Sequence, residues 1–188
     1  MPLTPTERSY LCQLADRAIR AAVEGTAVPD PADVAKEAGV ELTPALQEER
    51  GAFVTLTRDG NLRGCIGYIE GIKPLVEAVI DNGAAAATGD PRFEPVTAAE
   101  LDQLEIEVSA LTPLVEVDGP DDIEIGRHGI HIEKGSRRAV FLPQVATEQG
   151  WNINETLIHL CLKAQLPSNG WRMGCTMKVF EAEICPEP

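Results

Sequence analysis

The segment Leu62-Arg-Gly-Cys-Ile-Gly67 (LRGCIG) combines a thiol, a cation and two glycines within six residues. In an extended strand, Arg63 and Cys65 project from one face, about 7 Å apart, and Gly67 leaves that face bare. A nearby guanidinium favours the thiolate, which is the reactive form of cysteine. The segment therefore predicts a pocket with Cys65 as nucleophile or substrate contact and with Arg63, Gly64 and Gly67 binding the substrate. The alternative is a buried, inert Cys65, with glycines that permit helix packing.

Two further arginines could supply anion-binding groups. In Asp90-Pro-Arg-Phe93, Arg92 either binds an anion or pairs with Asp90 across the turn. Trp171 and Arg172 could stack on a ligand or line a pocket, although a loop tryptophan also serves as a core anchor. All three residues are candidate substrate-binding residues.

Candidate proton carriers come from the last third of the chain. Glu148 is a candidate catalytic residue and Gln149 a candidate substrate-binding residue, if this short helix borders a cleft; otherwise both are ordinary helix surface. His159 is a third catalytic candidate beside Cys65 and Glu148. A histidine on the rim of an apolar helix can instead be a hydrogen-bonded core residue.

The histidines and cysteines have poor spacing for metal binding. His128 and His131 face opposite sides of a strand, and His159 and Cys161 lie about 200° apart around a helix. The sequence has no Cys-x-x-Cys, His-Glu-x-x-His or three-cysteine cluster. We therefore expect neither a metal site nor a cofactor.

Composition limits the partners. The chain carries 16 Lys and Arg against 30 Asp and Glu, a net charge of −14, which disfavours binding to phosphate backbones. It has no apolar run long enough to span a membrane and no signal-peptide core in residues 1–20. Five widely spaced cysteines do not form a disulfide framework. We expect a cytoplasmic protein that binds no membrane.

Local signals alternate between hairpins and helices. Capping residues and proline predict helices from Pro5, Pro31 and Asn152, and Thr97 and Glu100 predict a capping box at Thr97. Asp59-Gly60 predicts a tight hairpin turn. Alternating apolar residues predict strands that include one from Met177 to Ile184, with Glu181 and Glu183 on its outward face. The pattern favours an α+β fold, a mostly antiparallel sheet flanked by helices with a smaller N-terminal helical lobe. We expect one domain over residues 1–188, with a possible lobe built mainly from residues 26–50.

Taken together, these motifs resemble the AMMECR-one (AMMECR1) domain family over roughly residues 5–185. The resemblance rests on the LRGCIG hexapeptide and on segments that follow in the same order: Asp90 to Phe93, Val108-Ser109, Gly129-Ile130, Leu142-Pro143, Glu148 to Trp151, Leu166-Pro167 and Trp171-Arg172. The later segments resemble the prokaryotic branch, AmmeMemoRadiSam system protein A. Tyr68 departs from the smaller residue that relatives often have after the hexapeptide.

The resemblance implies an α+β fold and no established activity. Prokaryotic members are typically encoded beside a Memo-type protein and a radical-SAM enzyme, so both are expected partners. A small anionic ligand is the other expected partner. Two hypotheses remain open, a binding component and an enzyme or catalytic subunit that uses Cys65. A third hypothesis, RNA binding, is opposed by the net charge of −14.

Overall fold

A computed structural model describes residues 2–185 and divides the chain into two compact units. Among the described residues, the first unit combines residues 2–111 with residues 183–185, and the second contains residues 112–182. Residues 26–50, where the sequence suggested a small lobe, belong to the first unit. The expectation of one domain with a lobe built mainly from residues 26–50 stays a prediction.

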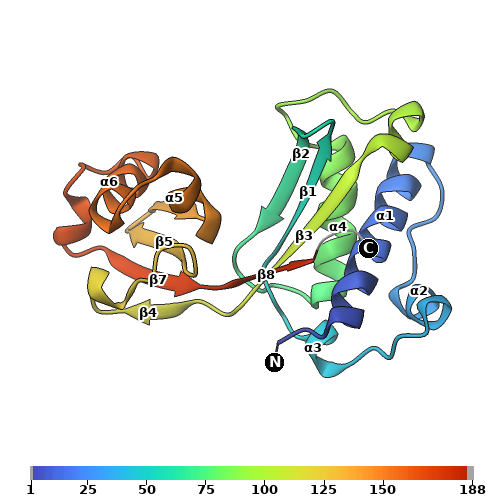
Figure 1. Ribbon diagram of the computed structural model, residues 1–188, viewed down its shortest axis with the longest axis horizontal. Helices are drawn as coiled ribbons and strands as arrows, with labels where there is room; N and C mark the ends of the chain where they lie inside the picture. The colour runs from blue at the N-terminus through green and yellow to red at the C-terminus, as the bar shows by residue number, and fades with distance from the viewer. Residues whose placement is uncertain (1, 186–188) are drawn as a thin grey trace. The chain divides into compact units, whose positions relative to one another are not determined.

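The first unit is a four-stranded sheet with two long helices on one face (Figure 1). The strand order is β2-β1-β3-β8, and β1 pairs antiparallel with both of its neighbours. The strands are β1 (Ala52–Arg58), β2 (Asn61–Tyr68), β3 (Glu105–Leu111) and β8 (Ala182–Cys185). The helical segments are α1 (Pro5–Glu24), α2 (Pro31–Ala38), α3 (Pro44–Gln47), α4 (Leu75–Thr88) and the 3-10 helix η1 (Ala98–Gln103).

Local sequence signals form these elements as expected. Thr4 and Glu7 make the predicted capping box of α1, and Asp30 caps α2. Asp59 and Gly60 both have positive φ, as a type I′ hairpin turn requires. Helices α1 and α4 pack on each other and bury the apolar face of β1 and β3, which forms the core of this unit.

The second unit has its own antiparallel sheet in the order β4-β7-β5-β6. Its strands are β4 (Val115–Val117), β5 (Gly129–Lys134), β6 (Arg137–Phe141) and β7 (Thr176–Phe180). The helical segments are α5 (Pro143–Gln149), α6 (Ile153–Lys163), η2 (Pro120–Asp122) and η3 (Gly170–Arg172). Apolar side chains of α6 and of the strands form a separate core. The structure confirms the expected α+β class with antiparallel sheets flanked by helices.

The single strand expected from Met177 to Ile184 is wrong. The chain leaves the ladder at Glu181, whose backbone exchanges hydrogen bonds with Thr112. Strand β7 then belongs to the second sheet and β8 to the first. Glu183, expected to face water, instead pairs with the buried Arg50 at 2.6 Å. The alternation of the sequence is not kept in β8, where Ile184 is 37% exposed and Cys185 is the buried residue.

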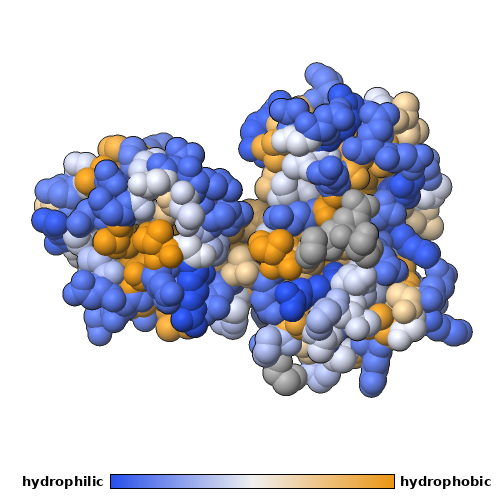
Figure 2. All heavy atoms as spheres, in the orientation of Figure 1, coloured by the Kyte–Doolittle hydropathy of each residue, from blue (hydrophilic) through white to orange (hydrophobic). Residues whose placement is uncertain are grey.

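Hydrophilic side chains cover most of both units in the view of Figure 2, and apolar side chains appear there in small, separate areas. None of the helices within residues 2–185 combines the length and apolar character needed to cross a membrane.

Candidate functional site

Cys65 lies on β2, an edge strand of the first sheet, opposite Thr55 of β1. Its side chain is half-buried, and its Sγ accepts a hydrogen bond from the Thr55 hydroxyl at 3.3 Å. The backbone groups of Cys65 point outward from the sheet edge, where they meet a loop instead of another strand. The thiol is therefore held in place by a neutral hydroxyl.

The loop that covers this edge is Asp90-Pro-Arg-Phe93. The Asp90 carboxylate accepts the Cys65 backbone N–H at 2.9 Å, and the Arg92 guanidinium donates to the Cys65 carbonyl at 3.2 Å. Asp90 and Arg92 also pair directly at 2.6 Å. The two side chains thus supply the acceptor and donor that a neighbouring strand would supply, which protects an exposed edge.

Electrostatics stabilise this arrangement. The Asp90 side chain is almost fully buried. Its hydrogen bond from the Arg92 side chain, reinforced by the backbone N–H groups of Cys65 and Arg92, holds its pKa below the ordinary value. Arg92 therefore pairs with Asp90, one of the two alternatives that the sequence left open. Its role as a substrate-binding residue stays a prediction.

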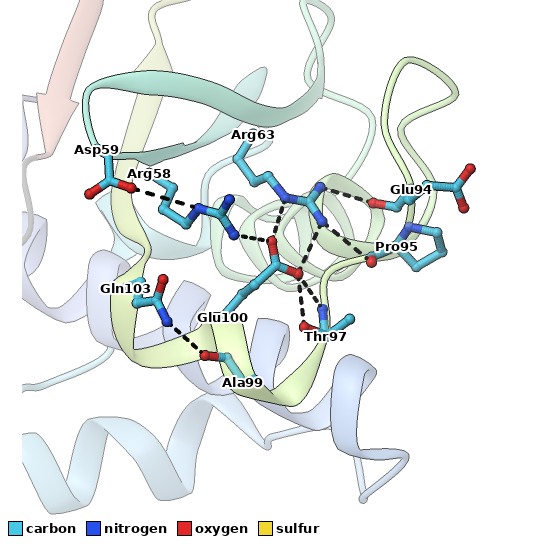
Figure 3. A network of polar contacts seen from close by, with 9 residues as sticks. All are labelled: Arg58, Asp59, Arg63, Glu94, Pro95, Thr97, Ala99, Glu100 and Gln103. Carbon is cyan, nitrogen blue, oxygen red and sulfur yellow. Dashed lines mark hydrogen bonds and ion pairs between the residues drawn. The ribbon is translucent and has the colours of Figure 1, made fainter.

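Arg63 does not share the geometry expected for it. The β1–β2 register shifts so that Leu56 pairs with Gly64 and Thr57 with Leu62, which leaves Arg63 unpaired in a β-bulge. A bulge interrupts the alternation of side chains on which the expected Arg63–Cys65 face depended. The side chain turns to Glu100 of η1, which Arg58 also contacts (Figure 3).

The Arg63 guanidinium is fully engaged there. Its Nε and Nη2 donate to the Glu100 carboxylate at 2.9 and 3.2 Å, and its Nη1 donates to the carbonyl of Glu94 at 2.9 Å. Glu100 also accepts hydrogen bonds from Thr97 in the predicted capping box (Figure 3). The Arg63 hydrogen bond is the main cause that lowers the pKa of Glu100 to about 2. Substrate binding by Arg63 stays a prediction.

The two glycines of the hexapeptide are explained by packing. A β-carbon at Gly64 would lie 2.2 Å from the carbonyl oxygen of Ala86 in α4. One at Gly67 would lie 2.4 Å from the ring of Phe53 and 2.3 Å from the carbonyl oxygen of Ala52. Gly64 brings the helix against the sheet, and Gly67 accepts an aromatic ring. Their proposed contact with a substrate stays a prediction.

The other candidates belong to the second unit. Glu148 and Gln149 are exposed on α5. His159 is also exposed, and its ring stacks on Trp151 with centroids 4.0 Å apart. Trp171 is partly buried against the second core, and Arg172 lies over its ring at 4.4 Å. Convergence of these residues with Cys65 stays a prediction.

Sequence reasoning missed two partners of the hexapeptide. Thr55 was not singled out, because the register set by the turn at Asp59-Gly60 would pair Cys65 with Val54, and the bulge at Arg63 moves the partner to Thr55. Glu100 was seen only as a capping residue, because nothing in local spacing joins it to Arg63, 37 positions away. Within residues 2–185, no three His, Cys, Asp or Glu side chains are grouped so that they could hold a metal ion.

The fold and this site define an α+β protein of two compact units, with a cysteine-bearing edge strand covered by an Asp–Arg loop. Comparison with known families matches residues 12–185 to the AMMECR1 family, and the chain belongs to it. It is 50% identical over 155 residues to a protein of Methanopyrus kandleri, which covers 77% of this chain and 75% of the relative. A protein of Methanothermobacter thermautotrophicus is 44% identical over 175 residues, covering 88% and 86%.

A solved structure supports the fold. The crystal structure of an uncharacterised protein from Pyrococcus horikoshii matches with a TM-score of 0.82 and 40% sequence identity. The match covers 94% of this chain and 89% of that one. The names of these relatives state no activity.

Proposed function

We propose that this AMMECR1-family chain is a ligand- or partner-binding component that works with radical-SAM and Memo-type proteins, and that it binds through the surface around Cys65. One observation carries the proposal: the charged groups that touch the hexapeptide already neutralise each other. Arg63 is held by Glu100, and Arg92 is held by Asp90. Such a surface is rigid and preorganised, which favours recognition.

The same contacts argue against a working nucleophile. A nucleophilic thiol is activated by an adjacent base or a cation that stabilises the thiolate. Within the described residues, the hydrogen bond at Cys65 Sγ comes from Thr55, whose hydroxyl is neither. The proximity of Arg92 to the Cys65 carbonyl is the observation that favours the enzyme alternative, in which Cys65 is a nucleophile or substrate contact in a small anionic pocket.

A binding experiment separates the two. Purified radical-SAM and Memo-type proteins encoded with this chain are titrated with the wild type and with Cys65→Ala, Cys65→Arg and the control Cys175→Ala. A binding component keeps its affinity and pathway output in Cys65→Ala and loses affinity in Cys65→Arg, where a large cation occupies the surface. Loss of output in Cys65→Ala with unchanged affinity would support the enzyme. Failure of the wild type to bind either protein would refute the proposal.

A further inference from the structure

The second unit carries four cations that come from four elements. Lys134 and Arg137 flank the turn between β5 and β6, Lys163 ends α6, and Arg172 lies in η3. We call these four side chains the basic end. All four residues are exposed. The β5–β6 hairpin, the end of α6 and η3 are separate in sequence.

The contacts of Lys134 and Arg137 join the hairpin to its neighbours. Lys134 donates to the carbonyl of Met173, and Arg137 donates to the carbonyl of Gln165 at 2.7 Å. These bonds place the hairpin turn beside the chain that follows α6. A carbonyl oxygen satisfies a hydrogen-bond donor without neutralising its charge.

Lys163 and Arg172 also contact only neutral groups. Lys163 donates to the carbonyl of Val140 at 2.9 Å, and Arg172 lies over the ring of Trp171. Among the described residues, none of the ion pairs involves a member of the basic end. Within residues 2–185, none of its four cations therefore forms an ion pair with a carboxylate.

This arrangement contrasts with the rest of an acidic chain. Residues 134–147 and 156–180 contain no Asp or Glu, although the whole chain has 30 of them. In the first unit, Arg63 and Arg92 each pair with a carboxylate, and in the second unit Arg127 pairs with Glu124 and Glu181. Carboxylates are thus absent from these two stretches, and the ones that precede them in the same elements are Glu133 of β5 and Glu155 of α6.

Exposed apolar side chains lie beside these cations. Leu162, next to Lys163, is 53% exposed, and Met173, next to Arg172, is 57% exposed. Protein interfaces are enriched in Met, Trp and Arg, and combine an apolar centre with charged groups around it. Binding to a phosphate backbone depends on positive charge and gains little from exposed leucine and methionine side chains.

We propose that the basic end, together with Leu162 and Met173, is a docking surface for an acidic protein partner. The inference deepens the proposed binding function and rests on it, because it names a second surface and the chemistry of its partner. The cations attract and orient acidic side chains of the partner, and the two apolar side chains are covered on contact.

The test uses the full chain and a fluorescent peptide of alternating Glu and Leu residues, with binding followed by fluorescence anisotropy. A protein of net charge −14 repels such a peptide unless a local basic surface receives it. We expect binding that weakens as salt rises to about 0.3 M, because salt screens surface charges. Arg172→Glu should weaken binding about tenfold, a typical effect of charge reversal at an interface.

Two variants sharpen the result. Lys36→Glu reverses an exposed charge on α2 of the first unit. It should leave the affinity for the peptide within about twofold of the wild-type value, because Lys36 lies outside the basic end. Leu162→Ser removes apolar area without changing charge and should weaken peptide binding. Circular dichroism of every variant checks that the fold is retained.

Three outcomes would overturn the inference: no peptide binding by the folded wild type, equal loss in Lys36→Glu and Arg172→Glu, or no effect of Leu162→Ser. Tighter binding of an oligouridylate of matched charge, also sensitive to Arg172→Glu, would reassign the surface to nucleic acid. If Arg172→Glu keeps its affinity for the radical-SAM or Memo-type protein and Cys65→Arg loses it, the docking role of the basic end is refuted and the proposed function stands. If neither Arg172→Glu nor Cys65→Arg weakens binding to the radical-SAM or Memo-type protein, the proposed function is refuted.

Discussion

The buried carboxylate of Asp90 accepts the backbone N–H of Cys65 at 2.9 Å, across 25 positions of sequence. This bond attaches a loop side chain to the open edge of β2, where a further strand would otherwise pair. Arg92 completes the contact from the same loop by donating to the Cys65 carbonyl. The hexapeptide and the Asp-Pro-Arg-Phe loop are therefore one structural unit.

Asp90→Asn tests the strength of that unit. The substitution removes the ion pair with Arg92 and weakens the acceptor for Cys65 in a buried position. We expect urea unfolding to show a loss of about 1–3 kcal/mol, the usual cost of breaking a buried hydrogen bond to a charged group. Asp102→Asn is the matched control, because the Asp102 side chain is exposed and its ion pair with Arg20 should contribute at most about 1 kcal/mol. Equal losses in the two variants would contradict the edge-covering role.

Glu100 should make stability depend on pH. The folded-state pKa is lowered to about 2, mainly by the Arg63 hydrogen bond, from an ordinary value of 4.5. The ionised Glu100 therefore adds to the free energy of unfolding. This contribution is fully present above about pH 4.5 and is lost as the pH falls toward about 2. Glu100→Gln should destabilise the protein at neutral pH and flatten this part of the acid dependence, measured by urea unfolding at several pH values. The exposed Glu105→Gln serves as control, and an unchanged pH profile in Glu100→Gln would refute the assignment.

Gly64→Ala should disturb the contact between β2 and α4. The added β-carbon would meet the Ala86 carbonyl oxygen at 2.2 Å, so helix and sheet must separate. Overpacking of this kind costs about 1–3 kcal/mol. Gly119→Ala, where nothing lies within 4 Å of the added carbon, should be nearly neutral. Thermal unfolding measures the stability of both variants against the wild type. If Gly64→Ala unfolds at the wild-type temperature, α4 can move to accommodate the added carbon and the close contact is not required.

The five thiols should differ in reactivity. Cys12, Cys161 and Cys185 are buried, and burial is the main cause that raises the pKa of Cys185 to about 12. Only Cys65 and Cys175 are partly exposed. Brief iodoacetamide treatment of the folded protein, followed by peptide mass spectrometry, should label these two before the buried three. Early labelling of Cys185 would contradict the packing of β8 against the first core.

Much of the local structure follows from short-range rules in the sequence. The capping boxes at Thr4, Thr97 and Asn152 and the hairpin turn at Asp59-Gly60 all form, because each needs only neighbouring backbone groups. The alternating residues of β3 likewise place their apolar side chains in the core. Family membership also followed from the motifs, since their order is retained along almost the whole chain.

The sequence by itself determined the elements, their turns and the family. The tertiary structure decided the partners of the key side chains: Arg63 with Glu100, Asp90 with Cys65, and the division of one apparent strand into β7 and β8. The physical reason is range. Capping and turn formation depend on residues a few positions apart, whereas a bulge, a sheet edge or an ion pair depends on which distant segments pack together.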